Sequence, residues 1–299
     1  MGVRLKDAHL DQHGFVLLQP DSALLSHELA ERDPWEAAAR LVGEPVELVE
    51  RQPIAPVPWG KSFASTSGQT PLHTDSQLFA GCPPDLQLMF CARPAERGGE
   101  TTLLDGWALL DRMAQVDPEL FRALTREERR IPFVFGEVVG PTLSLRRGRL
   151  VLTCSPMPLP QDPIAARLHP HLEATPVLRI RPAEGEVLVV NNHRMLHGRT
   201  AFEDPERKLT RLLVWLRTPL SSPEHLRSAC AELALRELPE PGATRRRVVL
   251  EMLRGVPPGV LARRHGIDEA TLYVWRDRAL AAADVALGAD PGEGSRWPR

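Results

Sequence analysis

The sequence predicts an α+β fold in which a large strand-rich domain precedes a small all-helical module. In the first part of the chain, short apolar runs such as HGFVLLQP, LQLMFCARP, GRLVLTCSP and EGEVLVVNN each end at Pro or Asn, as short strands closed by turns do. Stretches near 23–42 and 105–128 have helical periodicity instead. Beyond the segment ELPEPGAT the pattern is helical throughout. We therefore expect a strand-rich domain over 1–240, a helical module over 243–287 and a disordered tail over 288–299.

Composition restricts the class of protein. A chain of 299 residues with 42% hydrophobic content can bury a sizeable core. The net charge of -2 argues against nucleic acid or an anionic membrane as the main partner. The four cysteines are scattered without a C-x-x-C pair, which is typical of a reducing compartment. The N-terminal residues contain no long apolar run, so we predict a cytoplasmic protein without a membrane anchor.

The segment TPLHTDSQLF carries the first candidate site. His73 and Asp75 are two residues apart, and side chains at that spacing share one face of a strand. A histidine bonded to a neighbouring carboxylate inside a core is the plain alternative to metal binding. The pair alone does not decide between them.

A second buried strand, within residues 185–202, supplies a third donor. It ends in Asn191 and Asn192 and is expected to deliver His197 just beyond its end. Two histidines and one carboxylate, without a thiolate, are the ligand set of non-haem Fe(II), which binds them on one face of an octahedron. Fourteen residues later, Arg211 precedes the apolar run LLVWL. An arginine in that place is usually a surface residue, but a buried anion would give it a specific partner.

Three sequence blocks resemble a known family. HTD, PPDLQLMFCARPAERGGETTLLDG and NNHRMLHGRTAFEDPERKLTR have the order and spacing of the Fe(II)- and 2-oxoglutarate-dependent dioxygenases of the taurine dioxygenase superfamily. Within it they look most like the γ-butyrobetaine and trimethyllysine hydroxylase branch, over roughly the first 220 residues. The resemblance implies a double-stranded β-helix, or jelly roll, with Fe(II) held by His73, Asp75 and His197.

The same resemblance implies two cosubstrates, 2-oxoglutarate and O2. Arg211 would pair with the distal carboxylate of 2-oxoglutarate, and Thr101 would bond the same group. A buried carboxylate is costly unless it is paired, and a guanidinium can meet it with two parallel hydrogen bonds. The implied reaction hydroxylates an unactivated C–H and releases succinate and CO2. Asp75 stands where halogenases of the family carry Gly or Ala, which favours hydroxylation; desaturation and cyclisation use the same ligands.

Other histidines compete for the third ligand position. His193 would share a strand face with His197, but the family places its ligand before Gly-Arg, which selects His197 in the segment HGR. We expect His169 and His171 on the surface or in loops.

The predicted substrate departs from the branch. Its namesake enzymes hold a trimethylammonium group in a cage of aromatic rings, whereas the single tyrosine here, Tyr273, lies in the helical module. A carnitine-type substrate is therefore disfavoured. We expect an amino acid or a specialised-metabolite intermediate, contacted from the stretch before HTD by Lys61, Ser62 and Gln69.

The loop GEVVGPTLSLRRGRLVLTCSPMPLPQDP has the composition of a lid. Its pair Arg146 and Arg147 could hold an anionic substrate, but a solvated hairpin turn is the interpretation that we favour.

The C-terminal segment looks like a helix-turn-helix of the transposase-associated kind, with Gly266 at the turn. Five apolar residues are expected to form its core: Val260, Leu261, Ile267, Leu272 and Trp275. From Thr244 onward, ten arginines face seven acidic residues, a net of about +3. Asp268 and Glu269 at the start of the second helix would repel phosphates.

The sequence therefore disfavours DNA as a partner, and we predict docking or homo-oligomer formation through this module. Val274 adds to an apolar content larger than so small a module needs, so we expect some of these side chains to pack on the large domain or on a partner chain. The alternative is a DNA-associated regulator or a nucleic-acid oxygenase that the module directs to its target.

Overall fold

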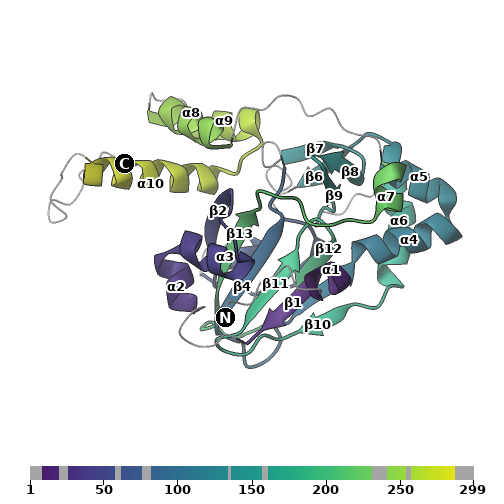
Figure 1. The fold of residues 1–299 in the computed structure, drawn as a ribbon, viewed down its shortest axis with the longest axis horizontal. Coiled ribbons are helices and arrows are strands. Elements are labelled where there is room, and N and C mark those ends of the chain that lie inside the picture. Colours follow the sequence, from purple (N-terminus) through teal and green to yellow (C-terminus); the bar gives the residue numbers. More distant parts are fainter. Residues whose placement is uncertain are drawn as a thin grey trace. The chain divides into compact units, whose positions relative to one another are not determined.

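The computed structural model describes eight segments of the chain, which are 9–19, 26–57, 62–75, 82–133, 136–156, 161–230, 241–253 and 257–286. They belong to two compact units. The larger takes in most of residues 1–234, and the smaller consists of Leu235–Arg299 together with the short segments Leu78–Gly81 and Val134–Glu137. The predicted tail over 288–299 and the candidate Lys61 lie outside the described segments. Each unit is described by itself below (Figure 1).

Two antiparallel sheets occupy the centre of the larger unit (Figure 1). The first has the order β1-β11-β4-β13-β2, with strands Phe15–Leu18, Val187–Asn191, Leu86–Arg93, Lys208–Trp215 and Leu48–Ile54. The second has the order β10-β5-β12-β3, with strands Leu178–Ile180, Thr101–Asp105, Met195–Arg199 and Thr70–His73. The remaining described strands form two two-stranded sheets, β6-β7 (Arg129–Phe133, Gly136–Gly140) and β8-β9 (Leu143–Arg146, Arg149–Leu152). The mixed fold predicted from the alternating runs is confirmed.

Alternation along the strands gives the first sheet two different faces. In β4, Leu86, Leu88 and Phe90 join the core cluster formed with α2 (His27–Arg32) and α3 (Pro34–Val42). The residues between them face the other way, as the period of two requires. There they meet the second sheet in a cluster of Ile54, Met89, Cys91, Leu103, Leu188, Val190, Met195 and Leu209. The two sheets therefore face one another across a shared apolar layer.

Each predicted helical stretch is split into two helices at an Asp-Pro step. Asp33 accepts a hydrogen bond from the Glu36 amide as the N-cap of α3, and Pro34 is the first helical residue. Asp117 does the same between α4 (Gly106–Val116) and α5 (Pro118–Arg126). Proline cannot continue a helix but fits its first turn, and aspartate is a preferred N-cap. Each Asp-Pro step therefore ends one helix and starts the next.

A second core lies on the outer face of the four-stranded sheet. Leu104 of β5 and Leu196 of β12 pack there with α4, α5, the β8-β9 hairpin and α6 (Pro163–Glu173). Figure 1 shows these three helices together with α7 (Glu224–Ala229) at one end of the unit. His169 is exposed on α6 and His171 is half-buried there, so both belong to a helix surface.

The described part of the smaller unit contains three helices, α8 (Pro241–Leu253), α9 (Pro258–His265) and α10 (Glu269–Ala286). Gly266 ends α9 with φ 62°, the left-handed conformation that favours glycine, which confirms the predicted turn. The buried core comprises Val248, Val249, Met252, Leu261, Ala262, Ile267, Leu272 and Trp275. Val260 is only half-buried, so its predicted place in the core was wrong. Val248, Val249 and Met252 of α8 contribute to this core instead.

Three apolar side chains that were predicted for the core of the helical module are indeed used there. Leu261, Leu272 and Trp275 are buried in its own core. Val274 is 42% exposed and Tyr273 beside it 40%. Among the described side chains of α10, the apolar ones in excess of the core are therefore Tyr273 and Val274, on its outer face.

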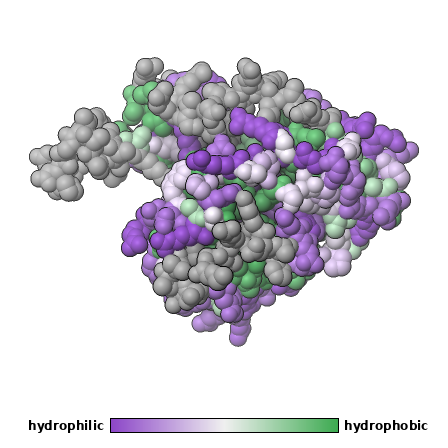
Figure 2. Space-filling view, viewed as in Figure 1, coloured by the Kyte–Doolittle hydropathy of each residue, from purple (hydrophilic) through white to green (hydrophobic). Residues whose placement is uncertain are grey.

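The surface is mixed. On the face drawn in Figure 2, hydrophilic side chains cover much of the larger unit, with hydrophobic ones in smaller patches among them. Among the described helices, none combines the length and apolar character that crossing a membrane requires. All four cysteines are free thiols, and burial raises the pKa of Cys82 and of Cys154 to about 12.

Candidate metal centre

The segment after β3 holds Asp75 in place. Strand β3 ends at His73, so Asp75 lies beyond it and the predicted shared strand face was wrong. The Asn192 side chain holds the Asp75 backbone instead. Its Oδ1 accepts from the Asp75 amide at 2.8 Å, and its Nδ2 donates to the Asp75 carbonyl at 3.2 Å. Asn192 is fully buried. A paired amide side chain thus fixes the backbone of the carboxylate residue.

The turn between β11 and β12 brings His197 to the same place. Within residues 192–194 the chain passes from the five-stranded sheet to the four-stranded one. His197 lies inside β12, not beyond a strand end as expected, and stands directly opposite His73 of β3. A Cβ on the neighbouring Gly198 would lie 2.5 Å from the Thr70 carbonyl oxygen. Only glycine allows β3 to approach β12 this closely.

Three donor groups converge between the sheets. His73 Nε2 lies 3.2 Å from Asp75 Oδ1, and His197 Nε2 lies 3.6 Å from Asp75 Oδ2. One donor atom from each residue can be chosen so that all lie within 4.8 Å of one another, and the two imidazole centroids are 4.4 Å apart. All three residues are buried. Among the described residues this is the single such cluster of metal-binding side chains.

The protonation states suit metal binding. Burial would raise the pKa of the Asp75 carboxyl, but the Arg211 guanidinium and the two imidazoles outweigh it and hold that pKa well below its ordinary value. Burial, followed by the neighbouring His73, lowers the pKa of His197. The cluster therefore presents a carboxylate and a neutral imidazole, the forms that bind a metal.

The donor set also fits the metal class. His73 Nδ1 lies 2.9 Å from the Pro71 carbonyl oxygen, which leaves Nε2 turned toward Asp75. Metal-binding histidines commonly use their second ring nitrogen in this way. Two imidazoles and one carboxylate, with no thiolate among them, match the facial set of a non-haem iron site. The residues present therefore fit a bound Fe(II).

Gln87 and Arg211 reach the cluster from the five-stranded sheet. Gln87 of β4 is fully buried, and its amide nitrogen donates to Asp75 Oδ2 and lies 3.0 Å from His197 Nε2. Arg211 of β13 donates to the same Oδ2 and, with its other terminal nitrogen, to Gln52 Oε1 of β2. The sequence prediction missed Gln87. A polar residue inside the buried run LQLMFC was the signal that could have found it.

Thr101 shares the inner face of the second sheet with His197. It is buried at the start of β5 opposite Arg199 of β12, two positions from the pair His197 and Leu103. Arg199 itself donates to the carbonyl oxygens of Phe63, Thr66 and Gly68. Burial lowers the pKa of Arg199 to about 10. This arginine is thus committed to the loop before β3.

Arg207 lies near the same aromatic ring as Arg199. Its guanidinium carbon lies 4.9 Å from the centroid of the Phe202 ring, and that of Arg199 lies at the same distance. Arg207 also donates to the Gly99 carbonyl oxygen at 3.2 Å. Neither arginine contacts the metal-binding cluster through a described hydrogen bond, whereas Arg211 does.

The predicted substrate contacts are placed as follows. The Ser62 hydroxyl is engaged with Ser65 in the short 3-10 helix Phe63–Ser65, and Gln69 is exposed. Neither touches the cluster through a described contact. The nearer side chain of this stretch is Phe63, whose ring centroid lies 5.9 Å from that of His73.

The two arginines of the predicted lid have different environments. Arg146 ends β8 and Arg147 lies in the turn of the β8-β9 hairpin, so the favoured interpretation of a solvated turn is correct for Arg147 and wrong for the buried Arg146. Arg147 is exposed with φ 49°, whereas Arg146 is buried and donates to Ser144 Oγ at 3.0 Å and Thr153 Oγ1 at 3.2 Å. Burial lowers the pKa of Arg146. The hairpin thus has one exposed cation, Arg147, and two buried ones, Arg146 and Arg149, of which Arg149 is paired with Asp85.

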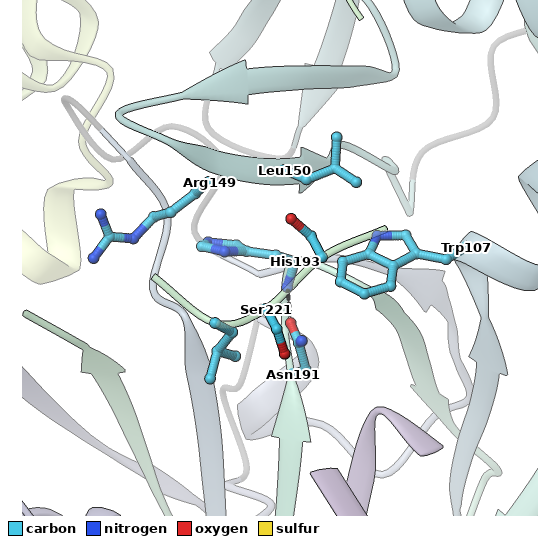
Figure 3. Close-up of a pocket in the computed structure, with 8 residues that line it drawn as sticks. Trp107, Arg149, Leu150, Asn191, His193 and Ser221 are labelled. Carbon is cyan, nitrogen blue, oxygen red and sulfur yellow. Dashed lines mark hydrogen bonds between the residues drawn. The ribbon is translucent and has the colours of Figure 1, made fainter. Parts of the chain in front are cut away.

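His193 lines a separate pocket. Its Nε2 lies 2.9 Å from the Pro83 carbonyl oxygen, and burial lowers its pKa. Figure 3 shows His193 and Trp107 approaching the pocket from opposite sides. The pocket is lined by Trp107, Arg149, Leu150, Asn191, His193, Leu220, Ser221 and Ser222. None of the three converging residues is among them.

Solved structures share the fold of the larger unit. An asparagine oxygenase matches with a TM-score of 0.52 and 20% identity over 70% of this chain and 75% of its own. A non-haem iron oxygenase, OrfP, in complex with Fe and α-ketoglutaric acid matches with a TM-score of 0.50 and 18% identity over 70% and 76%. At these identities the likeness is one of fold.

Sequence comparison assigns both parts of the chain. A uridine-5'-phosphate dioxygenase from Amycolatopsis sp is 28% identical over 228 residues, which are 66% of this chain and 82% of that protein. Residues 244–299 match a helix-turn-helix domain. Residues 4–150 and 155–213 match the family described as "Taurine catabolism dioxygenase TauD, TfdA family". These two segments span more than half of the sequence and contain all three converging residues, and the chain belongs to this family of dioxygenases.

Proposed function

We propose that the protein is an Fe(II)- and 2-oxoglutarate-dependent oxygenase that hydroxylates an unactivated C–H bond of a small molecule. The convergence of His73, Asp75 and His197 carries the proposal, because a buried carboxylate and two imidazoles form the ligand set of such enzymes. We further propose that the two facing sheets form the jelly roll of the family, and that the motif order reflects the γ-butyrobetaine branch.

Each residue then has a distinct role. His73, Asp75 and His197 hold Fe(II), and Arg211 pairs with the distal carboxylate of 2-oxoglutarate. Arg211 is the arginine best placed for this, because its guanidinium already binds a carboxylate of the cluster whereas Arg199 is bound to loop carbonyls. Thr101 supports the same carboxylate from β5.

The bound iron and 2-oxoglutarate supply the oxidising chemistry, which consumes O2 and forms succinate and CO2. The protein ligates, orients and excludes water. Burial of all three ligands and of Gln87 and Thr101 keeps water away from the cluster. Desaturation and cyclisation remain outcomes of the same ligand set.

Two substrate classes are compatible with the fold, amino acids and nucleoside 5'-phosphates, and we favour the second. Amino acids are named for the solved structures, which share only the fold, whereas the relative with 28% identity acts, by its name, on uridine 5'-phosphate. A phosphate would also match the buried Arg146, whose described hydrogen bonds go to two hydroxyls and to no carboxylate. We therefore extend the expected specialised-metabolite class to nucleoside 5'-phosphates.

The test is loss of iron in ligand variants. His73→Ala and His197→Ala should each abolish iron retention after desalting and succinate formation from 2-oxoglutarate. His169→Ala, on the exposed surface of α6, is the matched control and should behave as wild type. Wild-type turnover in either ligand variant would show that the proposed triad is wrong.

A substrate panel separates the two classes. Substrate-stimulated succinate formation is measured with uridine 5'-phosphate, uridine, L-asparagine and L-arginine. Stimulation by the nucleotide, reduced at least tenfold in kcat/KM by Arg146→Gln and unchanged by Arg147→Gln, supports the phosphate assignment. Stimulation by an amino acid alone would return the substrate to the first class.

A DNA-directed role is the second candidate, and the smaller unit offers little for it. Asp268 caps α10 by accepting from the Ala270 amide at 2.7 Å, so its charge lies at the start of that helix. Arg276 is paired with Asp277 at 2.7 Å and Arg264 with Glu251 at 2.7 Å. These contacts favour docking or self-association over DNA binding.

A further inference from the structure

Gln87 is a buried amide with two partners in the metal-binding cluster. Its side chain extends from the inner face of β4 between two apolar residues, Leu86 and Leu88, that pack on the opposite face. The amide nitrogen donates to Asp75 Oδ2 and lies 3.0 Å from His197 Nε2. Its Oε1 is buried without a hydrogen-bond partner in the described structure. Burial of an unsatisfied carbonyl is unfavourable, so another requirement keeps an amide at this position.

The two oxygens of Asp75 face different groups. Oδ1 lies 3.2 Å from His73 Nε2, while Oδ2 accepts from both Gln87 and Arg211. Oδ1 therefore lies beside the donor nitrogen of His73, where a metal bound by His73 would meet it.

Arg211 has a second carboxylate to bind when 2-oxoglutarate is present. A guanidinium that turns to that carboxylate gives up hydrogen bonds to Asp75 Oδ2. Gln87 still donates to this oxygen when Arg211 does not. Its bond to His197 Nε2 cannot coexist with a metal on that atom, since a neutral imidazole nitrogen has one lone pair.

We propose that Gln87 is a positioning residue that holds Asp75 Oδ2 and so fixes the carboxylate as a one-oxygen ligand through Oδ1. The inference rests on the proposed function, because it concerns the same metal site. The Gln87 bond to the carboxylate is charge-assisted and therefore roughly twice as strong as the neutral bond to His197. Loss of the amide should on balance weaken metal binding, although it also frees His197.

The experiment measures metal affinity without catalysis. Mn(II), a redox-stable stand-in for Fe(II), is titrated into metal-free full-length protein, and free Mn(II) is followed by electron paramagnetic resonance. Gln87→Met keeps the side-chain volume and removes the donor. Residues that orient metal ligands typically change affinity by about 10- to 100-fold when they are replaced, so the dissociation constant should rise by at least tenfold. Met89→Leu, two residues along the same face of β4, is the control and should not change it.

A second variant covers a folding failure. Gln87→Asn keeps the amide but shortens the side chain by one methylene, which withdraws it from Asp75, and it should lose affinity to a similar extent. The spectrum of bound Mn(II) should also change in both variants, whereas a merely structural role would leave it as in wild type. Wild-type affinity and spectrum in either folded variant would overturn the inference. Failure of the wild-type protein to bind Mn(II) would instead count against the proposed function.

Discussion

Arg211 is the charged residue on which the cosubstrate proposal depends. In the structure it is bound to Asp75 and Gln52, so its guanidinium is already desolvated and oriented. Replacement by alanine would leave the distal carboxylate of 2-oxoglutarate buried and unpaired.

We expect Arg211→Ala to reduce the apparent affinity for 2-oxoglutarate by well over tenfold. Removing one partner of a buried ion pair costs about 3–5 kcal/mol. The measurement is succinate formation against 2-oxoglutarate concentration. Arg211→Lys should recover only part of the loss, because an ammonium cannot form the two parallel bonds of a guanidinium. An unchanged affinity in Arg211→Ala would move the role to Arg199 or Arg207.

His193 makes stability depend on pH. Burial lowers its pKa in the folded protein, while the unfolded chain keeps a value of about 6.5. As the pH falls below about 6.5, the unfolded state binds a proton that the folded state rejects, so the free energy of unfolding decreases. The slope from this one group is at most about 1.4 kcal/mol per pH unit.

Urea unfolding of the metal-free protein at pH 7.5 and 5.5 tests this expectation. His193→Gln should lose less stability between the two values than wild type does. His169→Gln, on an exposed helix surface, should lose as much as wild type. Equal losses in all three proteins would show that His193 is not the titrating group.

Among the helices, the Asp-Pro steps set where one element ends and the next begins. Asp33 is both the C-cap of α2 and the N-cap of α3. Its side chain accepts a hydrogen bond from the Glu36 amide at 3.0 Å. The same short sequence therefore serves two helix ends.

Asp33→Ala should lower the free energy of unfolding by about 1 kcal/mol, the usual loss for an N-cap replaced by alanine. Asp33→Ser keeps a side-chain acceptor and should lose only a few tenths. Urea titration with circular dichroism measures both. Equal stability of Asp33→Ala and wild type would mean that Pro34 alone fixes the helix start.

The strands show what the sequence could predict about the site. The short alternating runs located β1, β4, β9 and β11, and the family resemblance selected three residues that the fold brings together. The resemblance did not reveal Gln87 or Asn192, because their contacts join residues more than ten and more than a hundred positions apart. Such long-range pairs have no local pattern.

The predicted strand geometry around Asp75 failed for a similar reason. Periodicity placed His73 and Asp75 on one strand, but β3 ends at His73 and a side chain from another strand fixes Asp75. The predicted helical stretches did not include the breaks at Asp33 and Asp117, although the Asp-Pro capping pattern is visible in the sequence there. Tertiary hydrogen bonds and caps thus account for the differences.

At the level of the whole molecule, the smaller unit needs a role beside the dioxygenase. Its outer α10 face carries Tyr273 and Val274, each about two-fifths exposed, next to the paired Arg276 and Asp277. That face suits a protein surface better than a phosphate backbone, so we propose that it supports assembly or activity.

Deletion of 243–299 tests this role. We expect the truncated chain to lose an oligomer, by light scattering, or turnover, and the full-length chain to show no tight, salt-sensitive binding of random duplex DNA. Val274→Ser should reproduce part of the effect on mass, and Arg263→Ser, an exposed arginine of α9, should not. Salt-sensitive DNA binding that disappears on deletion, with mass and turnover unchanged, would contradict the proposal.

Strand β3, which carries His73, lies at the edge of the four-stranded sheet. An open edge can recruit a strand from another molecule and so begin aggregation, and natural proteins counter this with short edge strands and with proline. β3 has four residues, and its second, Pro71, is exposed and has no amide hydrogen to offer. The residue whose carbonyl orients His73 therefore also helps to keep this edge from forming intermolecular β-sheet.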